Sequence, residues 1–169
     1  MKIRRAEISD AAAIVELYNW YIVNTSITFE TEPISVEEMK MRMEEKLDNY
    51  DWLVAEIDDV LVGYAYYGSF RSRAAYQHTV ESTIYLSREF KGQGIGSRLY
   101  KELIDSAKNK KYREMLAVIA IPNPESISFH KKMGFLEVGV MKKIGYKFNC
   151  YVDVSFLQKS LCDDLMEEQ

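Results

Sequence analysis

The sequence is poor in cysteine and has no long apolar segment. Its 169 residues include only two cysteines, Cys150 and Cys162, far from any Cys-x-x-Cys or Cys/His spacing typical of metal sites. This usage indicates a reducing compartment and packing roles for both thiols. No run of about 18 apolar residues occurs, and the first residues lack the apolar core of a signal peptide. We therefore expect a cytoplasmic protein.

The chain also lacks a strong excess of either charge. Lys and Arg together number 22 and Asp and Glu 26, which gives a formal net charge of -4. This balance argues against a general nucleic-acid-coating role, because such proteins carry an excess of positive charge. Hydrophobic residues make up 47% of the chain and charged residues 28%, as in an ordinary globular protein. We expect no nucleic-acid or membrane partner.

No internal repeat, low-complexity segment or linker divides the chain. A single domain of this length buries roughly two thirds of its unfolded surface, so neither a disulfide nor a structural metal is required for stability. We predict one mixed α/β domain over residues 1–162, followed by an acidic tail over residues 163–169.

Apolar residues recur at helix spacing in some segments and at strand spacing in others. One helix is predicted after Ser9, which is placed to cap it, and a second after Ser35, where Ser35 and Glu38 have capping-box spacing. A third follows residue 97 and a fourth covers residues 125–133. Strands are predicted at residues 2–6, 52–57, 60–68, 79–86, 115–121, 135–140 and 151–158.

The first motif that indicates chemistry is a glycine-rich segment, Lys91-Gly92-Gln93-Gly94-Ile95-Gly96-Ser97, between a predicted strand and a predicted helix. Alternate glycines let backbone N–H groups turn toward a ligand, and a helix N-terminus favours negative charge. The segment lacks the Gly-Lys-Ser/Thr of a Walker loop and comes too late in the chain for a first Rossmann turn. It predicts a phosphate-binding loop, with a purely structural turn as the alternative.

This loop resembles the acetyl-CoA pyrophosphate loop of the GNAT acetyltransferase superfamily, which reads Gln/Arg-x-x-Gly-x-Gly/Ala. Residues 123–135, an Asn-led helix that ends in Gly134-Phe135, resemble the second signature of the superfamily. Further blocks are similar to the phosphinothricin (methionine-sulfoximine-type) N-acetyltransferases, namely residues 18–22, 29–33, 52–56, 71–76, 79–85 and 145–148. The resemblance implies one GNAT domain with a twisted mixed sheet of six or seven strands flanked by helices.

The resemblance implies acetyl-CoA as co-substrate and no metal. The residues expected to bind the coenzyme are the main chain of Ile84, Tyr85 and Leu86, the loop residues Lys91, Gly92, Gln93, Gly94, Ile95, Gly96 and Ser97, and Asn123. A backbone N–H at the end of the strand over residues 79–86 is also the implied oxyanion donor. Lys91 stands where the family usually has Gln or Arg, and a lysine meets a phosphate as a point charge without a bidentate contact.

Acetyl transfer requires a neutral amine, so a general base is useful at neutral pH. Glu81, in the middle of a predicted strand, matches the general base of the resembling family, which acts through water. A solvated glutamate on an exposed sheet face is the alternative. His130 matches a family position that assists the base or protonates the leaving thiolate, and its alternative is packing beside Phe129 and Met133. His78 matches no motif and is expected to be structural.

Three residues are expected to bind the acceptor. Arg73 and Tyr76 lie in a loop that sets guanidinium groups beside an aromatic ring, which suits a carboxylate or phosphinate, with an ordinary solvated loop as the alternative. Phe29 matches a substrate-pocket position that the family completes near a dimer interface, so a homodimer is implied. The implied reaction is direct acetyl transfer to the amino group of phosphinothricin, methionine sulfoximine or methionine sulfone, an activity associated with resistance.

Two other functions remain open. The same chemistry could serve another amine, such as a protein N-terminus or a polyamine. A module that binds acetyl-CoA or an antibiotic without turnover belongs to a different class, and the presence of both Glu81 and His130 argues against it.

Overall fold

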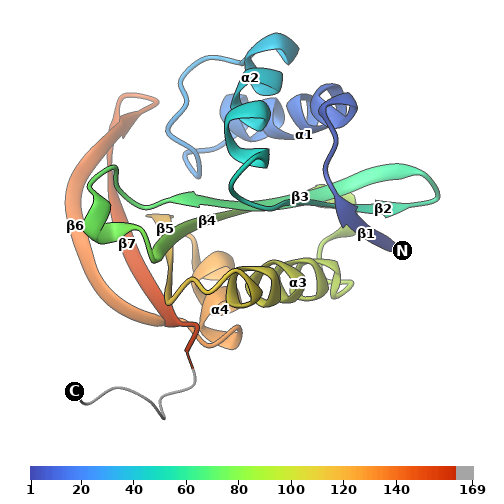
Figure 1. The fold of residues 1–169 in the computed structure, drawn as a ribbon. Coiled ribbons are helices and arrows are strands. Elements are labelled where there is room, and N and C mark those ends of the chain that lie inside the picture. Colours follow the sequence, from blue (N-terminus) through green and yellow to red (C-terminus); the bar gives the residue numbers. More distant parts are fainter. Residues whose placement is uncertain (163–169) are drawn as a thin grey trace.

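The computed structural model describes residues 1–162, which form a seven-stranded sheet with helices on both faces (Figure 1). The strands are β1 (Lys2–Arg5), β2 (Trp52–Ile57), β3 (Val60–Ser69), β4 (Thr79–Leu86), β5 (Glu114–Ile121), β6 (Leu136–Lys147) and β7 (Cys150–Ser160). The helices are α1 (Ala11–Asn24), α2 (Val36–Leu47), α3 (Ile95–Asn109) and α4 (Pro124–Lys132). The predicted mixed sheet flanked by helices is confirmed, whereas the predicted acidic tail lies outside the described residues.

The sheet divides the hydrophobic core into two layers, one on each of its faces. Helices α1 and α2 cover one face of the sheet and α3 and α4 the other (Figure 1). Side chains of β3 alternate between these layers, because successive residues of a strand point to opposite faces. Tyr64 packs with the α1/α2 layer, and Ala65 and Tyr67 pack with the α3 layer. Both faces of the central strands are therefore buried.

The centre of the sheet opens where β4 and β5 separate. Its strand order is β1-β2-β3-β4-β5-β7-β6, and within residues 1–162 the β4–β5 pair is parallel while the other neighbours are antiparallel. On β4, pairing with β5 covers residues 79–82, whereas pairing with β3 continues to Leu86. On the side toward β5, the last four residues of β4 therefore face an opening, while on the other side they remain paired with β3.

The helix starts agree with the sequence at one position and differ at another. The Ser35 hydroxyl accepts a hydrogen bond of 3.1 Å from the Glu38 N–H, so Ser35 caps α2 as predicted. The prediction that Ser9 caps the first helix is wrong, because Ser9 lies inside a 3-10 turn, Ile8–Asp10. Asp10 fixes that turn by accepting the Glu7 N–H at 2.8 Å, and α1 begins after it.

The final hairpin is longer than the sequence pattern indicated. Strand β6 extends to Lys147, seven residues beyond the predicted end at Val140. A register irregularity between Met141 and Gly145 interrupts the alternation of side chains. Within residues 1–162, no helix is both long enough and apolar enough to span a membrane.

Candidate active site

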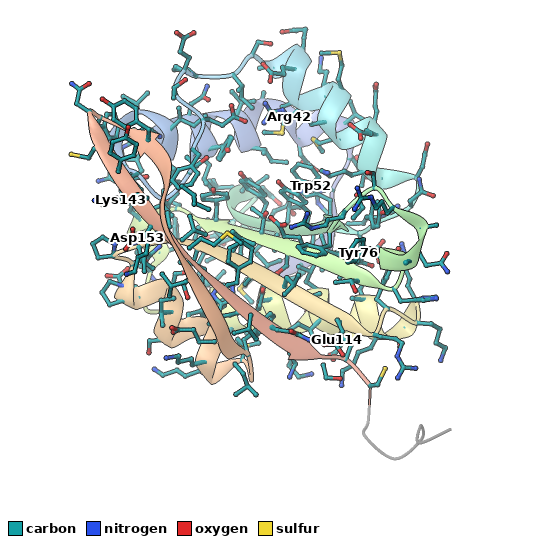
Figure 2. The ribbon with its side chains drawn as sticks, turned by 90° about the vertical axis from the view of Figure 1, so that its left-hand side faces the viewer. Arg42, Trp52, Tyr76, Glu114, Lys143 and Asp153 are labelled. Atoms are coloured by element: carbon teal, nitrogen blue, oxygen red, sulfur yellow. The ribbon has the colours of Figure 1, made fainter. Side chains whose placement is uncertain are left out.

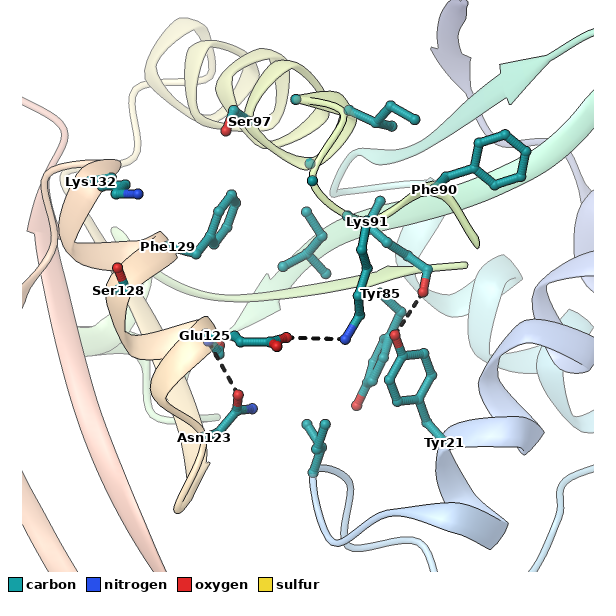
Figure 3. A pocket seen from close by; sticks show the side chains of 18 residues that line it. Tyr21, Tyr85, Phe90, Lys91, Ser97, Asn123, Glu125, Ser128, Phe129 and Lys132 are labelled. Carbon is teal, nitrogen blue, oxygen red and sulfur yellow. Dashed lines mark hydrogen bonds and ion pairs between the residues drawn. The ribbon is translucent and has the colours of Figure 1, made fainter. Parts of the chain in front are cut away.

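A cavity of about 760 Å³ lies at the open end of β4 (Figure 3). Its walls come from the end of β4, the glycine loop, the first turn of α3 and the first turns of α4. The predicted coenzyme residues that line it are Ile84, Tyr85, Leu86, Lys91, Gly92, Gly94, Ile95, Gly96, Ser97 and Asn123. Gln93 is not among the lining residues, and its side-chain amide is 3.4 Å from the Glu89 carbonyl. The structure thus brings all but one of these residues to one cavity.

The glycine loop owes its shape to its glycines. Gly92 and Gly94 have φ values of 78° and 77°, a region that L side chains rarely adopt. Gly94 is the N-cap of α3, so the unpaired N–H groups of the first helical turn lie beside the cavity. A Cβ at Gly96, in the first turn of α3, would lie 2.8 Å from Leu86 Cδ1, so a larger residue would require the Leu86 side chain, which lines the cavity, to shift.

An ion pair joins the glycine loop to α4 beside the cavity. Lys91 Nζ lies 3.1 Å from a carboxylate oxygen of Glu125, as Figure 3 shows. Asn123 caps α4 by accepting the Ser126 N–H at 3.2 Å, so its Oδ1 atom already has a partner. Sequence reasoning did not assign Glu125 to the site, although it stands within the matched motif of residues 123–135. A negatively charged side chain is not expected at a site that binds an anion.

Tyr21 is a second cavity residue that sequence reasoning did not assign to the site. Its side chain is buried and its hydroxyl donates a hydrogen bond of 2.7 Å to the Leu86 carbonyl. Helical spacing of apolar residues in α1 accounts for the buried ring of Tyr21 but carries no information about its hydroxyl group. Phe129 and Lys132, which also line the cavity, come from the predicted α4.

Glu81 lies on the α1/α2 face of the sheet. It pairs with Gly68 of β3 and with Leu116 of β5, and it is partly buried. Burial raises the pKa of its carboxyl group, while the positive charge of Lys46 opposes that change. A carboxylate with a raised pKa is a better base than an ordinary glutamate. The sequence alternative of a fully solvated glutamate does not describe this position.

His130 lies on the other face of the sheet, so the structure does not bring the two catalytic candidates together. Its ring is 4% exposed and packs edge-on against Tyr100, whose hydroxyl is 2.6 Å from Oγ of Ser82 on β4. Nδ1 donates to the Ser126 carbonyl at 2.8 Å, because a carbonyl oxygen only accepts. Burial lowers the pKa of His130, and the residue is not part of the cavity lining.

The acceptor residues predicted from sequence lie apart from this cavity lining. Arg73 and Tyr76 are exposed in the loop that enters β4 at Thr79, the end opposite Leu86 (Figure 2 labels Tyr76). Tyr76 packs edge-on against Phe70, with ring centroids 5.6 Å apart. This loop therefore lies at the end of β4 near Glu81, whereas the cavity lies at the end formed by residues 84–86.

Phe29 packs on the final hairpin. A Cβ at Gly145 of β6 would lie 2.3 Å from the Phe29 ring, so only glycine permits this contact. Beside it, Lys147 Nζ donates a buried hydrogen bond of 2.9 Å to the Thr28 carbonyl. The Thr28 hydroxyl is in turn 2.7 Å from the Tyr18 hydroxyl. These contacts fix the connector between α1 and α2 beside β6.

Comparisons with known proteins agree with this fold and cavity. The sequence pattern of the acetyltransferase (GNAT) domain matches residues 3–156. A phosphinothricin N-acetyltransferase of Streptomyces viridochromogenes is 38% identical over 94% of this chain and 87% of that protein. An L-methionine sulfoximine/L-methionine sulfone acetyltransferase of Salmonella typhimurium is 33% identical over 95% of each chain.

A solved structure gives the same result. The phosphinothricin acetyltransferase of Sinorhizobium meliloti, in complex with acetyl-CoA, superposes with a TM-score of 0.91 at 37% identity. The match covers 94% of this chain and 87% of that chain. The chain belongs to the GNAT acetyltransferase family.

Acetyl-CoA, the acyl donor of this family, fits the residues around the cavity. A Cβ at Gly92 or Gly94 would meet no atom within 4 Å apart from those of its neighbours in the chain, so a ligand can approach the backbone closely. The positive end of α3 and the Lys91 ammonium suit a pyrophosphate. Within residues 1–162, no cluster of three or more His, Cys, Asp or Glu side chains could hold a metal ion.

Proposed function

We propose that this protein transfers the acetyl group of acetyl-CoA to the amino group of a small, amino-acid-like acid of the phosphinothricin, methionine sulfoximine or methionine sulfone type. The observation that carries the proposal is the cavity at the end of β4, because ten residues predicted to bind the coenzyme line it. The identity of the acceptor rests on the two relatives, whose names specify acids of this type.

The coenzyme end of the site is formed by the glycine loop and β4. N–H groups of the loop and of the first turn of α3 bind the pyrophosphate, with the Lys91 ammonium as a further positive charge. Main-chain groups of Ile84, Tyr85 and Leu86 are not paired with β5 and align the thioester end. A backbone N–H there stabilises the negative charge that develops on the acetyl oxygen.

Glu81 is the general base for the acceptor amine. At neutral pH an α-amino group is mostly protonated, so the reactive neutral form requires removal of one proton. Glu81 accepts that proton through water on the face of β4 that looks toward α2. Arg73 and Tyr76 bind the acidic group of the acceptor from the adjoining loop, and Phe29 lines the acceptor pocket. His130, packed against Tyr100, is the proton donor to the thiolate; because Nδ1–H is held by the Ser126 carbonyl, it must first take up a second proton at Nε2.

The active form is a cytoplasmic homodimer that requires neither nucleic acid nor a membrane. Exposed apolar side chains gather on the final hairpin, where Leu136 is 74% and Tyr151 68% exposed. Others on the same hairpin are Val138, Val140, Met141, Ile144 and Tyr146. A surface of this kind favours association with a second copy. Acetylation of a toxic amino-acid analogue would give resistance to it.

A thiol-release assay tests the proposal. Purified protein and acetyl-CoA are incubated with phosphinothricin, methionine sulfoximine, methionine sulfone, common amino acids, a polyamine and N-terminal peptides. Rapid release of free thiol with the first three compounds is expected. Preference for the polyamine or the peptides would overturn the proposed acceptor, and coenzyme binding without thiol release across the panel would overturn catalysis. Arg73→Ala should raise KM for the acceptor, and an unchanged KM would remove Arg73 from the site.

A further inference from the structure

The side chain of Lys46, from α2, lies over the face of the sheet that carries Glu81. It belongs to the last turn of α2, and its Nζ atom lies 5.6 Å from the centre of the Tyr66 ring on β3. A Cβ at Gly68 would lie 3.1 Å from Nζ and 3.8 Å from Cε, so the end of the lysine rests on the bare backbone of Gly68. Gly68 is the residue of β3 that pairs with Glu81. Two residues paired across antiparallel strands share a face of the sheet.

Lys46 supplies a positive charge that acts on the Glu81 carboxyl group. Tyr66 faces it from β3 and is neutral, because burial raises the pKa of its hydroxyl. From β5, Glu114 lies two residues before the partner of Glu81 and accepts a hydrogen bond of 2.9 Å from Gln158. Arg42 of α2 binds Glu30 and Glu38, and Arg71, Arg73 and His78 are exposed in the segment between β3 and β4.

We propose that Lys46 is a positioning residue that holds the Glu81 carboxylate in its charged, base-competent form and so determines the acidic limit of turnover. The inference rests on the proposed role of Glu81 as general base. A half-buried carboxylate without a counter-charge binds a proton more readily, and a protonated Glu81 cannot accept the proton of the amine. The absence of a side chain at Gly68 gives the ammonium group room beside the carboxylate.

The test measures the ionisation of Glu81 directly and through catalysis. The Glu81 carboxyl resonance is titrated by carbon-detected NMR, and kcat/KM is recorded against pH, in the wild type and in Lys46→Met. Methionine keeps an unbranched side chain over Tyr66 but removes the charge. We expect the Glu81 titration and the acidic limb of kcat/KM to move together to higher pH. At the acidic end of the profile, kcat/KM should fall roughly three- to tenfold.

Two further variants separate charge from packing. Lys46→Arg keeps the positive charge, so the Glu81 titration and the acidic limb of kcat/KM should both stay as in the wild type. Lys40→Met removes the same charge from another position of α2 and should leave both unchanged. An unaltered Glu81 titration in Lys46→Met would overturn the inference. So would a higher KM for the acceptor at every pH with an unmoved limb, because Lys46 would then bind substrate.

Glu81→Gln distinguishes this inference from the proposed function. Full activity in that variant would show that Glu81 is not the base and would overturn both the base assignment and the control of turnover by Lys46. Lost activity in Glu81→Gln with an unaltered Glu81 titration in Lys46→Met would leave the base in place and overturn Lys46 alone.

Discussion

The Tyr21 hydroxyl donates a 2.7 Å hydrogen bond to the carbonyl of Leu86, the last residue of β4. This bond ties α1 to the stretch of β4 that has separated from β5. It fixes the direction of the peptide groups at the mouth of the cavity, although Tyr21 itself belongs to the helix on the opposite layer (Figure 3).

Tyr21→Phe should therefore weaken acetyl-CoA binding. The ring still packs against Tyr85, but the Leu86 carbonyl loses its donor. We expect a loss of about 1 kcal/mol in the free energy of unfolding and a severalfold higher Kd for acetyl-CoA. Denaturant unfolding and calorimetric titration measure the two effects. Tyr112→Phe, between α3 and β5, is the control and should leave the Kd unchanged. An unchanged Kd in Tyr21→Phe would show that the bond serves stability alone.

Glu81→Gln should lower activity and raise stability. General-base loss typically costs about 10²- to 10⁴-fold in kcat. Because burial raises the pKa of Glu81, the folded protein binds a proton there more tightly than the unfolded chain does. Ionised Glu81 therefore costs stability at neutral pH, and this cost disappears as the pH falls below the ordinary glutamate range.

Urea unfolding at neutral and acidic pH checks the second effect. The variant should be more stable than the wild type at pH 7, and the two should converge in acid. Glu102→Gln, an exposed position on α3, is the control and should follow the wild type. Equal stability of Glu81→Gln and wild type at pH 7 would contradict the burial argument, and equal kcat would remove Glu81 from the mechanism.

Glu125→Gln should improve binding of the coenzyme. In the free protein Lys91 pairs with Glu125 at 3.1 Å, so a pyrophosphate must compete with that carboxylate for the same ammonium group. Both side chains are largely exposed, and exposed ion pairs are weak, so KM for acetyl-CoA should fall only about two- to threefold. Added salt should reduce the difference.

Steady-state kinetics at low and high ionic strength measure this competition. Asp105→Asn, which breaks the exposed Lys101–Asp105 pair on α3, is the matched control. A higher KM in Glu125→Gln would mean that Glu125 itself holds the coenzyme, which would contradict the competition.

Local signals predicted the coenzyme half of the site, and long-range packing determined the rest. Positive φ angles at Gly92 and Gly94 follow from glycine itself, and the strand and helix around them have clear periodicity. The contact between Phe29 and Gly145 joins segments more than a hundred residues apart, so no local pattern indicates it. The same holds for Lys46 beside Glu81, since a lysine in the last turn of a helix is ordinarily read as solvated.

The two catalytic candidates illustrate the same limit. Alternation along a strand puts Glu81 and Ser82 on opposite faces of β4, as the structure has them. Which of these faces receives α4, and with it His130, depends on the crossover from β5 and cannot be obtained from spacing within the helix. Sequence reasoning therefore proposed cooperation between two residues that the sheet separates.

His130→Asn should remove a pH dependence of stability. Burial lowers the pKa of His130, so below about pH 6.5, the ordinary histidine value, the unfolded chain takes up a proton that the folded protein binds less tightly. The free energy of unfolding of the wild type should therefore fall as the pH drops through that range. Asparagine retains an N–H donor for the Ser126 carbonyl but does not titrate. In His130→Asn the free energy of unfolding should therefore no longer fall with pH through this range.

The same variant decides the catalytic role of His130 when its pH–rate profile is recorded beside that of the wild type. Packing alone predicts that kcat keeps its pH dependence while the stability slope disappears, because the imidazole packs among Tyr100, Phe129 and Phe135 and does not itself line the cavity. A proton donor to the thiolate predicts that a limb of the kcat profile disappears as well. His78→Asn, at an exposed histidine, is the control for both measurements. A stability slope that persists in His130→Asn would contradict the assignment of that slope to the buried ring.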